Sequence, residues 1–256
     1  MRLRLHTLGI VLAASLIALT PPAGAASRGD HSPASADSAE GFWVARMPDG
    51  VNVKWVILDG GETWGIYEAQ GTILGTFHGV TRSANGALQG RGTAYDIPSD
   101  TVGTTDYTGS YIARQAITLN TGFGTNVSGQ YASGYDQPAS LGTLQGRYEG
   151  EALRSRRPVM GMSLQVTEGG AFVMMSMQDC AASGQATPRP GGKNVFNVSL
   201  HFAGRACPLG DGVHTTGIAH VNATSGELFM LGMNEARTDG WLYLGQRQLA
   251  SIRRGE

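Results

Sequence analysis

The chain has 256 residues, of which 38 are glycine and only 15% are charged. An average soluble protein has about 7% glycine and about 25% charged residues. This composition excludes a coiled coil, a long-helix bundle and a charged disordered tail. The net charge of -1 argues against a nucleic-acid partner, which normally requires a basic excess. A hydrophobic fraction of 41% is enough to fill a core.

The N-terminal segment has the features of a secretory signal peptide. Arg2 and Arg4 precede an apolar run over residues 8–19, and Ala23 and Ala25 supply the small residues of a cleavage site. The run of about 12 residues is too short to span a bilayer. No cysteine lies near the cleavage site to accept a lipid anchor. We therefore expect a signal peptide over residues 1–25 and a periplasmic or secreted mature protein without a transmembrane span.

The next segments predict a linker followed by strands. Residues 26–40 are mostly Ser, Ala, Asp and Gly and are typical of a flexible linker. From Gly41 onward, short runs of Val, Ile, Trp, Tyr and Thr alternate with turn-forming pairs such as Asp49-Gly50 and Asn85-Gly86. A spacing of about ten residues per strand favours an all-β fold, which would be either an antiparallel meander barrel or a sandwich.

Period-two alternation supports this fold class. Residues 160–166 and 195–202 place apolar side chains at every second position and Gly or polar residues between them. Such strands bury one face and expose the other, as antiparallel sheets allow. The one helical turn that the sequence favours lies near residues 138–144.

The sequence is also internally doubled. Two short segments recur about 105 residues apart: GFWVA at 41–45 with GRYEG at 146–150, and LDGG at 58–61 with TEGG at 167–170. We therefore expect two similar β units in tandem, an N-terminal unit over residues 41–143 and a C-terminal unit over residues 144–252. A single large barrel is the alternative.

The two cysteines, Cys180 and Cys207, both lie in the predicted C-terminal unit. An exported pair with no third partner predicts a structural disulfide. A zinc site would require more ligands at close spacing, and a catalytic thiol rarely has an equal partner in an oxidising compartment.

Several segments of the C-terminal half resemble a group of functionally uncharacterised proteobacterial envelope proteins. They are GKNVFNVSL at 192–200, CPL at 207–209, GIAH at 217–220 and LGMNEARTDGWLYLG at 231–245. The resemblance covers most of residues 41–249 and implies an all-β barrel in the cell envelope. Many members of the group are lipoproteins, and this chain departs from them in lacking a lipid-attachment cysteine. A looser likeness to the barrels of Gram-negative surface-binding lipoproteins concerns the fold alone.

Metal and cofactor sites are not indicated. His214 and His220 share one face of a predicted strand but would lie about 20 Å apart, too far to bind one ion. We therefore expect four histidines on sheet surfaces: His78, His201, His214 and His220. The methionines are expected to fill the core rather than to form a thioether site for Cu(I). We expect no metal and no cofactor.

Two polar segments are the candidate contact sites. Asp96, Asp100 and Asp106 fall in an expected polar loop over residues 96–109, without the spacing or closing glutamate of a calcium-binding EF-hand loop. Near the C-terminus, Asn234, Arg237 and Asp239 form either a ligand cluster at a barrel mouth or a turn between the last two strands. The sequence favours the turn, with Arg237 bonded to loop carbonyls.

Three functions remain open because no compact catalytic signature such as G-x-S-x-G is present. The leading one is a non-catalytic binding or structural protein of the bacterial cell envelope. It would recognise an envelope component or host-surface molecule through loops at 96–109 and 154–157. The second is a carrier that encloses a small apolar ligand, which an internal apolar cavity would favour. The third is a hydrolase, which a cleft with converging carboxylates or a Ser–His pair would favour.

Export can be tested on the mature N-terminus. We expect cleavage between Ala25 and Ala26, because the small residues follow the apolar run at the usual spacing. Mass spectrometry of the protein recovered from its host should show a chain that begins at Ala26. A chain that retains Met1 would contradict the prediction.

Overall fold

The computed structural model describes residues 37–121, 126–154, 157–177, 179–207 and 209–248. The predicted signal peptide and most of the predicted linker lie outside the described residues. The first eight strands are β1 (Gly41–Arg46), β2 (Asn52–Ile57), β3 (Glu62–Ala69), β4 (Thr72–Ala84), β5 (Ala87–Asp96), β6 (Thr101–Ile112), β7 (Ala116–Thr121) and β8 (Asn126–Tyr131). The second set is β9 (Gly146–Arg154), β10 (Arg157–Val166), β11 (Ala171–Ser176), β12 (Ala181–Pro188), β13 (Phe196–Ala203), β14 (His214–Val221), β15 (Glu227–Asn234) and β16 (Gly240–Arg247).

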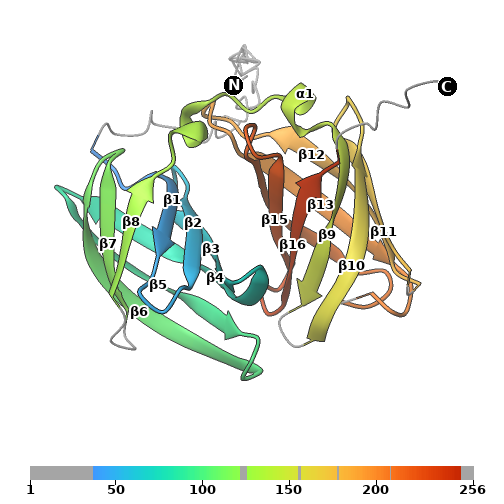
Figure 1. The fold of residues 1–256 in the computed structure, drawn as a ribbon, viewed down its shortest axis with the longest axis horizontal. Coiled ribbons are helices and arrows are strands. Elements are labelled where there is room, and N and C mark those ends of the chain that lie inside the picture. Colours follow the sequence, from blue (N-terminus) through green and yellow to red (C-terminus); the bar gives the residue numbers. More distant parts are fainter. Residues whose placement is uncertain (1–36, 122–125, 155–156, 178, 208, 249–256) are drawn as a thin grey trace, which may run out of the picture. The chain divides into compact units, whose positions relative to one another are not determined.

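The strands form two closed antiparallel barrels in tandem, an N-terminal barrel of β1–β8 and a C-terminal barrel of β9–β16 (Figure 1). Each strand pairs with its neighbours in sequence, and each barrel closes between its first and last strands. Ala45 of β1 lies opposite Gly129 of β8, and Leu153 of β9 lies opposite Leu242 of β16. The predicted all-β meander of two similar units is confirmed, and the sandwich and the single large barrel are wrong.

A short connection with two helical turns joins the barrels. The 3-10 turn η1 (Ser133–Asp136) follows β8, and the helix α1 (Leu141–Leu144) precedes β9. The helical turn expected near residues 138–144 is therefore present. No helix among the described residues is long and apolar enough to cross a membrane.

The internal doubling of the sequence is a structural repeat. The segments at 58–61 and 167–170 form equivalent turns, between β2 and β3 and between β10 and β11. Their last glycines, Gly61 and Gly170, have φ values of 80° and 79°. Each donates its backbone N–H to the carbonyl three residues earlier, at 2.8 and 3.0 Å. A side chain would be strained at this φ, which explains why both turns end in glycine.

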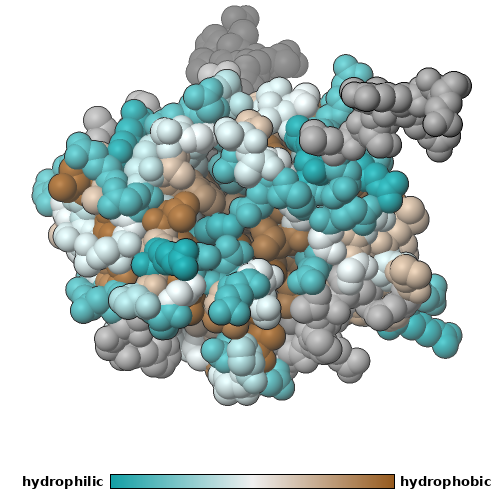
Figure 2. Space-filling model, in the orientation of Figure 1, coloured by the Kyte–Doolittle hydropathy of each residue, from teal (hydrophilic) through white to brown (hydrophobic). Residues whose placement is uncertain are grey.

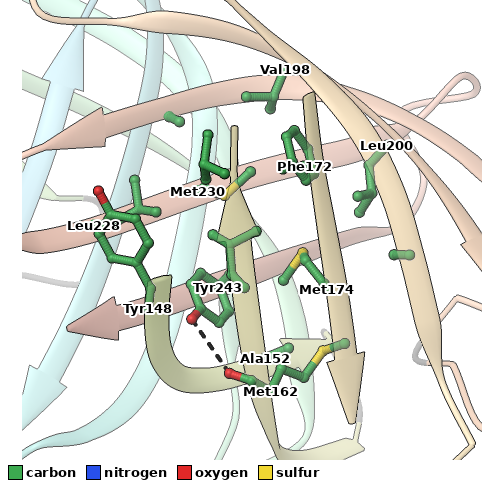
Figure 3. Close-up of a cluster of buried hydrophobic side chains, with 14 of the residues drawn as sticks. Tyr148, Ala152, Met162, Phe172, Met174, Val198, Leu200, Leu228, Met230 and Tyr243 are labelled. Atoms are coloured by element: carbon green, nitrogen blue, oxygen red, sulfur yellow. Dashed lines mark hydrogen bonds between the residues drawn. The ribbon is translucent and has the colours of Figure 1, made fainter. Parts of the chain in front are cut away.

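The interior of the C-terminal barrel is filled with large side chains. Figure 3 shows Tyr148, Phe172, Met174 and Tyr243 among the side chains that gather inside it. Tyr148, Met174 and Tyr243 are almost completely buried, and the Tyr243 hydroxyl donates to the carbonyl of Met162 at 3.4 Å. An eight-stranded barrel is just wide enough for side chains of this size to fill it.

Some strands bury both of their faces because the two barrels pack against each other. In β15, Leu228 and Met230 belong to the core of the C-terminal barrel. The alternate residues Phe229 and Leu231 belong to a second cluster that includes Trp64 of β3. A strand covered on both faces loses its polar alternation, and residues 228–231 are accordingly a continuous apolar run.

Ion pairs border this apolar contact. The ammonium of Lys54 lies 2.8 Å from Glu227 of the C-terminal barrel and 3.1 Å from Glu68. Burial alone would lower the pKa of Lys54, but the hydrogen bonds and charges of the two carboxylates outweigh burial and raise the pKa. Arg189 lies 3.4 Å from Asp59 across the same contact.

The exposed large apolar side chains include single residues and one short row. On the face drawn in Figure 2, apolar residues occur in separate patches among hydrophilic ones. Val80 and Ile112 are exposed in the N-terminal barrel, and Val173, Met175 and Met177 are exposed at alternate positions along and just after β11. Single exposed apolar residues are ordinary on a protein surface.

The predicted disulfide is confirmed. Cys180, just before β12, is bonded to Cys207 in the connection between β13 and β14, and the Cα atoms are 4.7 Å apart. Both cysteines are buried. The bond ties this connection to the start of the neighbouring strand.

Replacing both Cys180 and Cys207 by alanine should lower the free energy of unfolding by roughly 3–4 kcal/mol. The cross-link joins residues about 27 apart, and its removal restores that much loop entropy to the unfolded chain. Urea denaturation followed by tryptophan fluorescence measures the change. Reduction of the wild-type protein should give a similar loss, and equal midpoints for all three samples would contradict the prediction.

Candidate ligand cavity

The N-terminal barrel encloses a cavity of about 590 Å³. Its walls come from inward-facing residues of β2 to β8 together with residues of the β1–β2 and β5–β6 turns. Cavities that bind small molecules usually measure about 300–1,000 Å³. The volume is therefore sufficient for one small ligand.

Small side chains on the inner face create this space. Gly65 lies directly between the inward-facing Trp55 and Phe77 in the strand register, and Ala94 lies between Phe77 and Gly103. All five residues line the cavity. Glycine and alanine thus occupy the places at which a packed barrel would carry large side chains.

One end of the barrel is closed by residues 37–40, which we call the plug segment. Ala39 in this segment is fully buried, and its carbonyl accepts a hydrogen bond from the indole N–H of Trp43 at 3.0 Å. The Ala39 N–H donates to Ser83 Oγ of β4 at 3.0 Å. The hydroxyl of Tyr111 on β6 donates to the carbonyl of Asp37, also at 3.0 Å. The plug segment is therefore bonded to side chains of three wall strands, β1, β4 and β6.

The other end of the barrel gives access to solvent. The cavity lining there includes Met47 and Val51 at the β1–β2 turn, and Ser99 and Thr101 at the β5–β6 turn. Ser99 and Thr101 are exposed. Because exposed residues contribute to the lining, the cavity opens at this end of the barrel.

The polar groups of the lining are mostly neutral hydroxyls. Thr63 donates to the carbonyl of Gly61 at 3.0 Å and lies 2.6 Å from Thr81, which lies 2.6 Å from the Tyr107 hydroxyl. Since Thr63 has one proton to donate, Thr81 donates to Thr63 and Tyr107 donates to Thr81. Burial raises the pKa of Tyr67, another lining residue, to about 12. These groups stay uncharged at neutral pH.

The described lining carries little charge. Among the described residues that line the cavity, Asp96 at the open end is the one charged side chain, and there is no histidine or cysteine. The lining residues that the structure describes therefore include no pair of carboxylates and no Ser–His pair. The described lining can enclose a small molecule.

The prediction of a polar loop over residues 96–109 is wrong. Only residues 97–100 form a turn, and residues 101–112 form β6. The inward positions of this strand include Thr101, Gly103 and Thr105, which line the cavity. Inward residues that face a cavity do not have to be large and apolar, so the usual alternation is weak in the sequence.

The structure does not bring the three loop aspartates together. Asp96 ends β5 and accepts the backbone N–H of Ser99 at 2.8 Å. Asp100 lies in the turn with a φ of 51°. Asp106 lies within β6, where it is exposed and 3.7 Å from Arg91. Asp96 alone reaches the cavity. The tip of the other candidate loop, at residues 154–157, lies outside the described residues.

Asn234, Arg237 and Asp239 belong to the β15–β16 turn that the sequence favours. The side-chain carbonyl of Asn234 accepts the backbone N–H groups of Thr238 and Asp239 at 2.9 and 3.2 Å. Arg237 instead extends to the N-terminal barrel, where its guanidinium lies 3.3 Å from Glu62. The expected bonds of Arg237 to loop carbonyls are therefore replaced by a contact between the barrels.

The histidines differ in their surroundings. His220 is buried between the barrels, stacked on Phe42 at 4.3 Å, and donates from Nδ1 to the carbonyl of Asn194 at 2.7 Å. The expected surface position is wrong for His220, because its face of β14 is covered by the other barrel. His78 lies 3.2 Å from Glu62. No group of three or more His, Cys, Asp or Glu side chains suited to a metal ion occurs in the described part of the chain.

The comparisons with known proteins do not identify the chain. No protein-family profile and no curated protein sequence matches it. A candidate outer membrane protein from Bacteroides fragilis is similar at 11% identity over 82% of this chain and 96% of that one. The TM-score is 0.24, and at this value the match carries no information about fold or function. The resemblance to proteobacterial envelope proteins stays a prediction, although the all-β barrel that it implies is present.

Protonation of His220 should destabilise the protein in acid. Burial lowers its pKa from 6.5 to about 4. Between these values the unfolded chain binds a proton that the folded chain does not. The free energy of unfolding should therefore fall by about 3 kcal/mol as the pH drops from 6.5 to 4. Urea midpoints across this range should fall less steeply in His220→Phe, which keeps a ring on Phe42. The exposed control His214→Ala should follow the wild type, and identical slopes for all three proteins would contradict the prediction.

Proposed function

We propose that the protein is a non-catalytic carrier that binds one small apolar ligand inside the N-terminal barrel. The observation that carries this proposal is the difference between the two barrels. The N-terminal barrel is hollow and opens at one end, whereas large side chains fill the C-terminal barrel. A barrel of eight strands can hold one small ligand when its inward side chains are small.

The lining indicates the class of ligand. Trp55, Tyr67, Phe77 and Tyr107 give the walls an aromatic character, which suits a flat or cyclic apolar molecule. A buried carboxylate would need a cationic partner, and the described lining has none. We therefore propose a neutral ligand rather than a fatty-acid anion.

The polar groups suggest how such a ligand would be oriented. In the chain of hydroxyls that ends at Tyr107, every proton is already donated within the protein, so the Tyr107 oxygen remains available as an acceptor. A neutral ligand with one hydroxyl or N–H donor would complement it. This contact would fix the orientation of an otherwise apolar molecule.

We also propose that the carrier acts in the periplasm or outside the cell. The predicted leader supports export, and the disulfide between Cys180 and Cys207 supports an oxidising compartment. Recognition through loops is less well supported, because most of the segment at 96–109 is strand. The cavity lining likewise gives no support to a hydrolase.

A cavity-filling substitution tests the proposal. Ala94 faces the cavity between Phe77 and Gly103, so Ala94→Phe places an additional ring in the ligand space. Titration with the neutral fluorescent probe N-phenyl-1-naphthylamine should show one site per wild-type chain. Its affinity should fall at least tenfold in Ala94→Phe. Ala87→Phe, which adds the same ring to an exposed position of β5, is the matched control.

Competition tests the ligand class. A long-chain alcohol should displace the probe more effectively than the carboxylate of the same chain length, because the lining has no cation to pair with the carboxylate. Equal probe binding by Ala94→Phe and Ala87→Phe would reject the cavity as the site. Stronger displacement by the carboxylate would reject the neutral ligand while leaving the cavity as the site.

A further inference from the structure

Two histidines meet on the outer face of the C-terminal barrel. His201 of β13 and His214 of β14 are direct partners in the strand register, and their ring centroids are 4.4 Å apart at an interplanar angle of 33°. His214 is exposed and His201 is partly exposed. They lie 13 positions apart in the chain, so only the pairing of β13 with β14 brings the rings together.

A β-bulge sets the spacing of this pair. Gly212, at a φ of 75°, donates its N–H to the carbonyl of Phe202, and Phe202 donates its own N–H to the carbonyl of Val213, each at 3.0 Å. This is the pattern of a glycine bulge with Gly212 and Val213 opposite one residue. The adjacent pair His201 and His214 is consequently a non-hydrogen-bonded pair, the kind in which facing side chains are closest.

The connection that follows β13 is held on both sides. Cys207 within it is disulfide-bonded to Cys180, and the Asp211 carboxylate accepts the backbone N–H of Gly204 at 2.9 Å. The backbone that carries the two rings is therefore constrained beyond the hydrogen bonds of the strands. A constrained backbone reduces the entropy lost when both side chains bind one ligand.

We propose that His201 and His214 form a chelating site for a borderline divalent transition-metal ion. Imidazole nitrogens suit Cu²⁺, Ni²⁺ and Zn²⁺. Two nitrogens that each lie about 2.1 Å from one ion are at most about 4.2 Å apart, which is close to the 4.4 Å between the two ring centroids. Water completes the coordination, because the described residues supply no third His, Cys, Asp or Glu to the pair. The affinity order is expected to be Cu²⁺ above Ni²⁺ and Zn²⁺.

Metal titration of the full chain without an affinity tag tests the proposal. At pH 7.5, isothermal titration with Cu²⁺ should show one ion per chain at this site. The affinity should fall at least tenfold in both His201→Ala and His214→Ala, because each variant leaves a single imidazole. His78→Ala, which removes a histidine of the N-terminal barrel, should bind as the wild type does. The electron paramagnetic resonance spectrum of bound Cu²⁺ should show coupling to two nitrogens in the wild type.

Two further measurements make the outcome decisive. Cu²⁺ should raise the melting temperature of the wild type and of His78→Ala but not that of the two pair variants. Protons compete for imidazole, so the ion should be released on acidification to pH 5. The proposal is overturned if both His201→Ala and His214→Ala bind Cu²⁺ with the wild-type affinity. Urea midpoints of the variants check that each is folded, and His214→Gln is the substitute if His214→Ala is not.

Discussion

An eight-stranded barrel has a nearly fixed circumference, so the volume of its inward side chains decides whether its interior is solid or hollow. The two barrels of this chain share strand number, strand order and even the glycine turns after their second strands. They differ in what points inward. Tyr148 and Tyr243 occupy the interior of one barrel, whereas Gly65 and Ala94 leave space in the other. The tandem repeat thus provides two copies of one frame that can serve different purposes.

The contact between the barrels depends on strands that are buried twice. Trp64 of the N-terminal barrel and Leu231 of the C-terminal barrel point away from their own interiors and into a common cluster. Lys54 and Glu227 pair at its border. The contact has an apolar centre with ion pairs at its border, the usual composition of a protein interface. The C-terminal barrel, with its filled core and disulfide, therefore supports the wall of the hollow one.

The sequence predicted the fold class, the doubling and the disulfide, because each depends on local patterns or on composition. It missed β6, since Thr101, Gly103 and Thr105 face a cavity and lack apolar alternation. The burial of His220 was missed because nothing in the sequence shows which strand face a second barrel covers. The pair of His201 with His214 depends on strand register, and a bulge at Gly212 sets that register. What the sequence could not give was long-range geometry.

The plug segment makes the hollow barrel a cup rather than a tube. The four residues 37–40 precede the first strand, yet Ala39 is as deeply buried as the core of the barrel wall. With one end closed, a bound molecule would have to leave by the path through which it entered. Its residence time would then depend on motions of the turns at the open rim, which can change in sequence without disturbing the strands. Rates of uptake and release could therefore evolve separately from the choice of ligand.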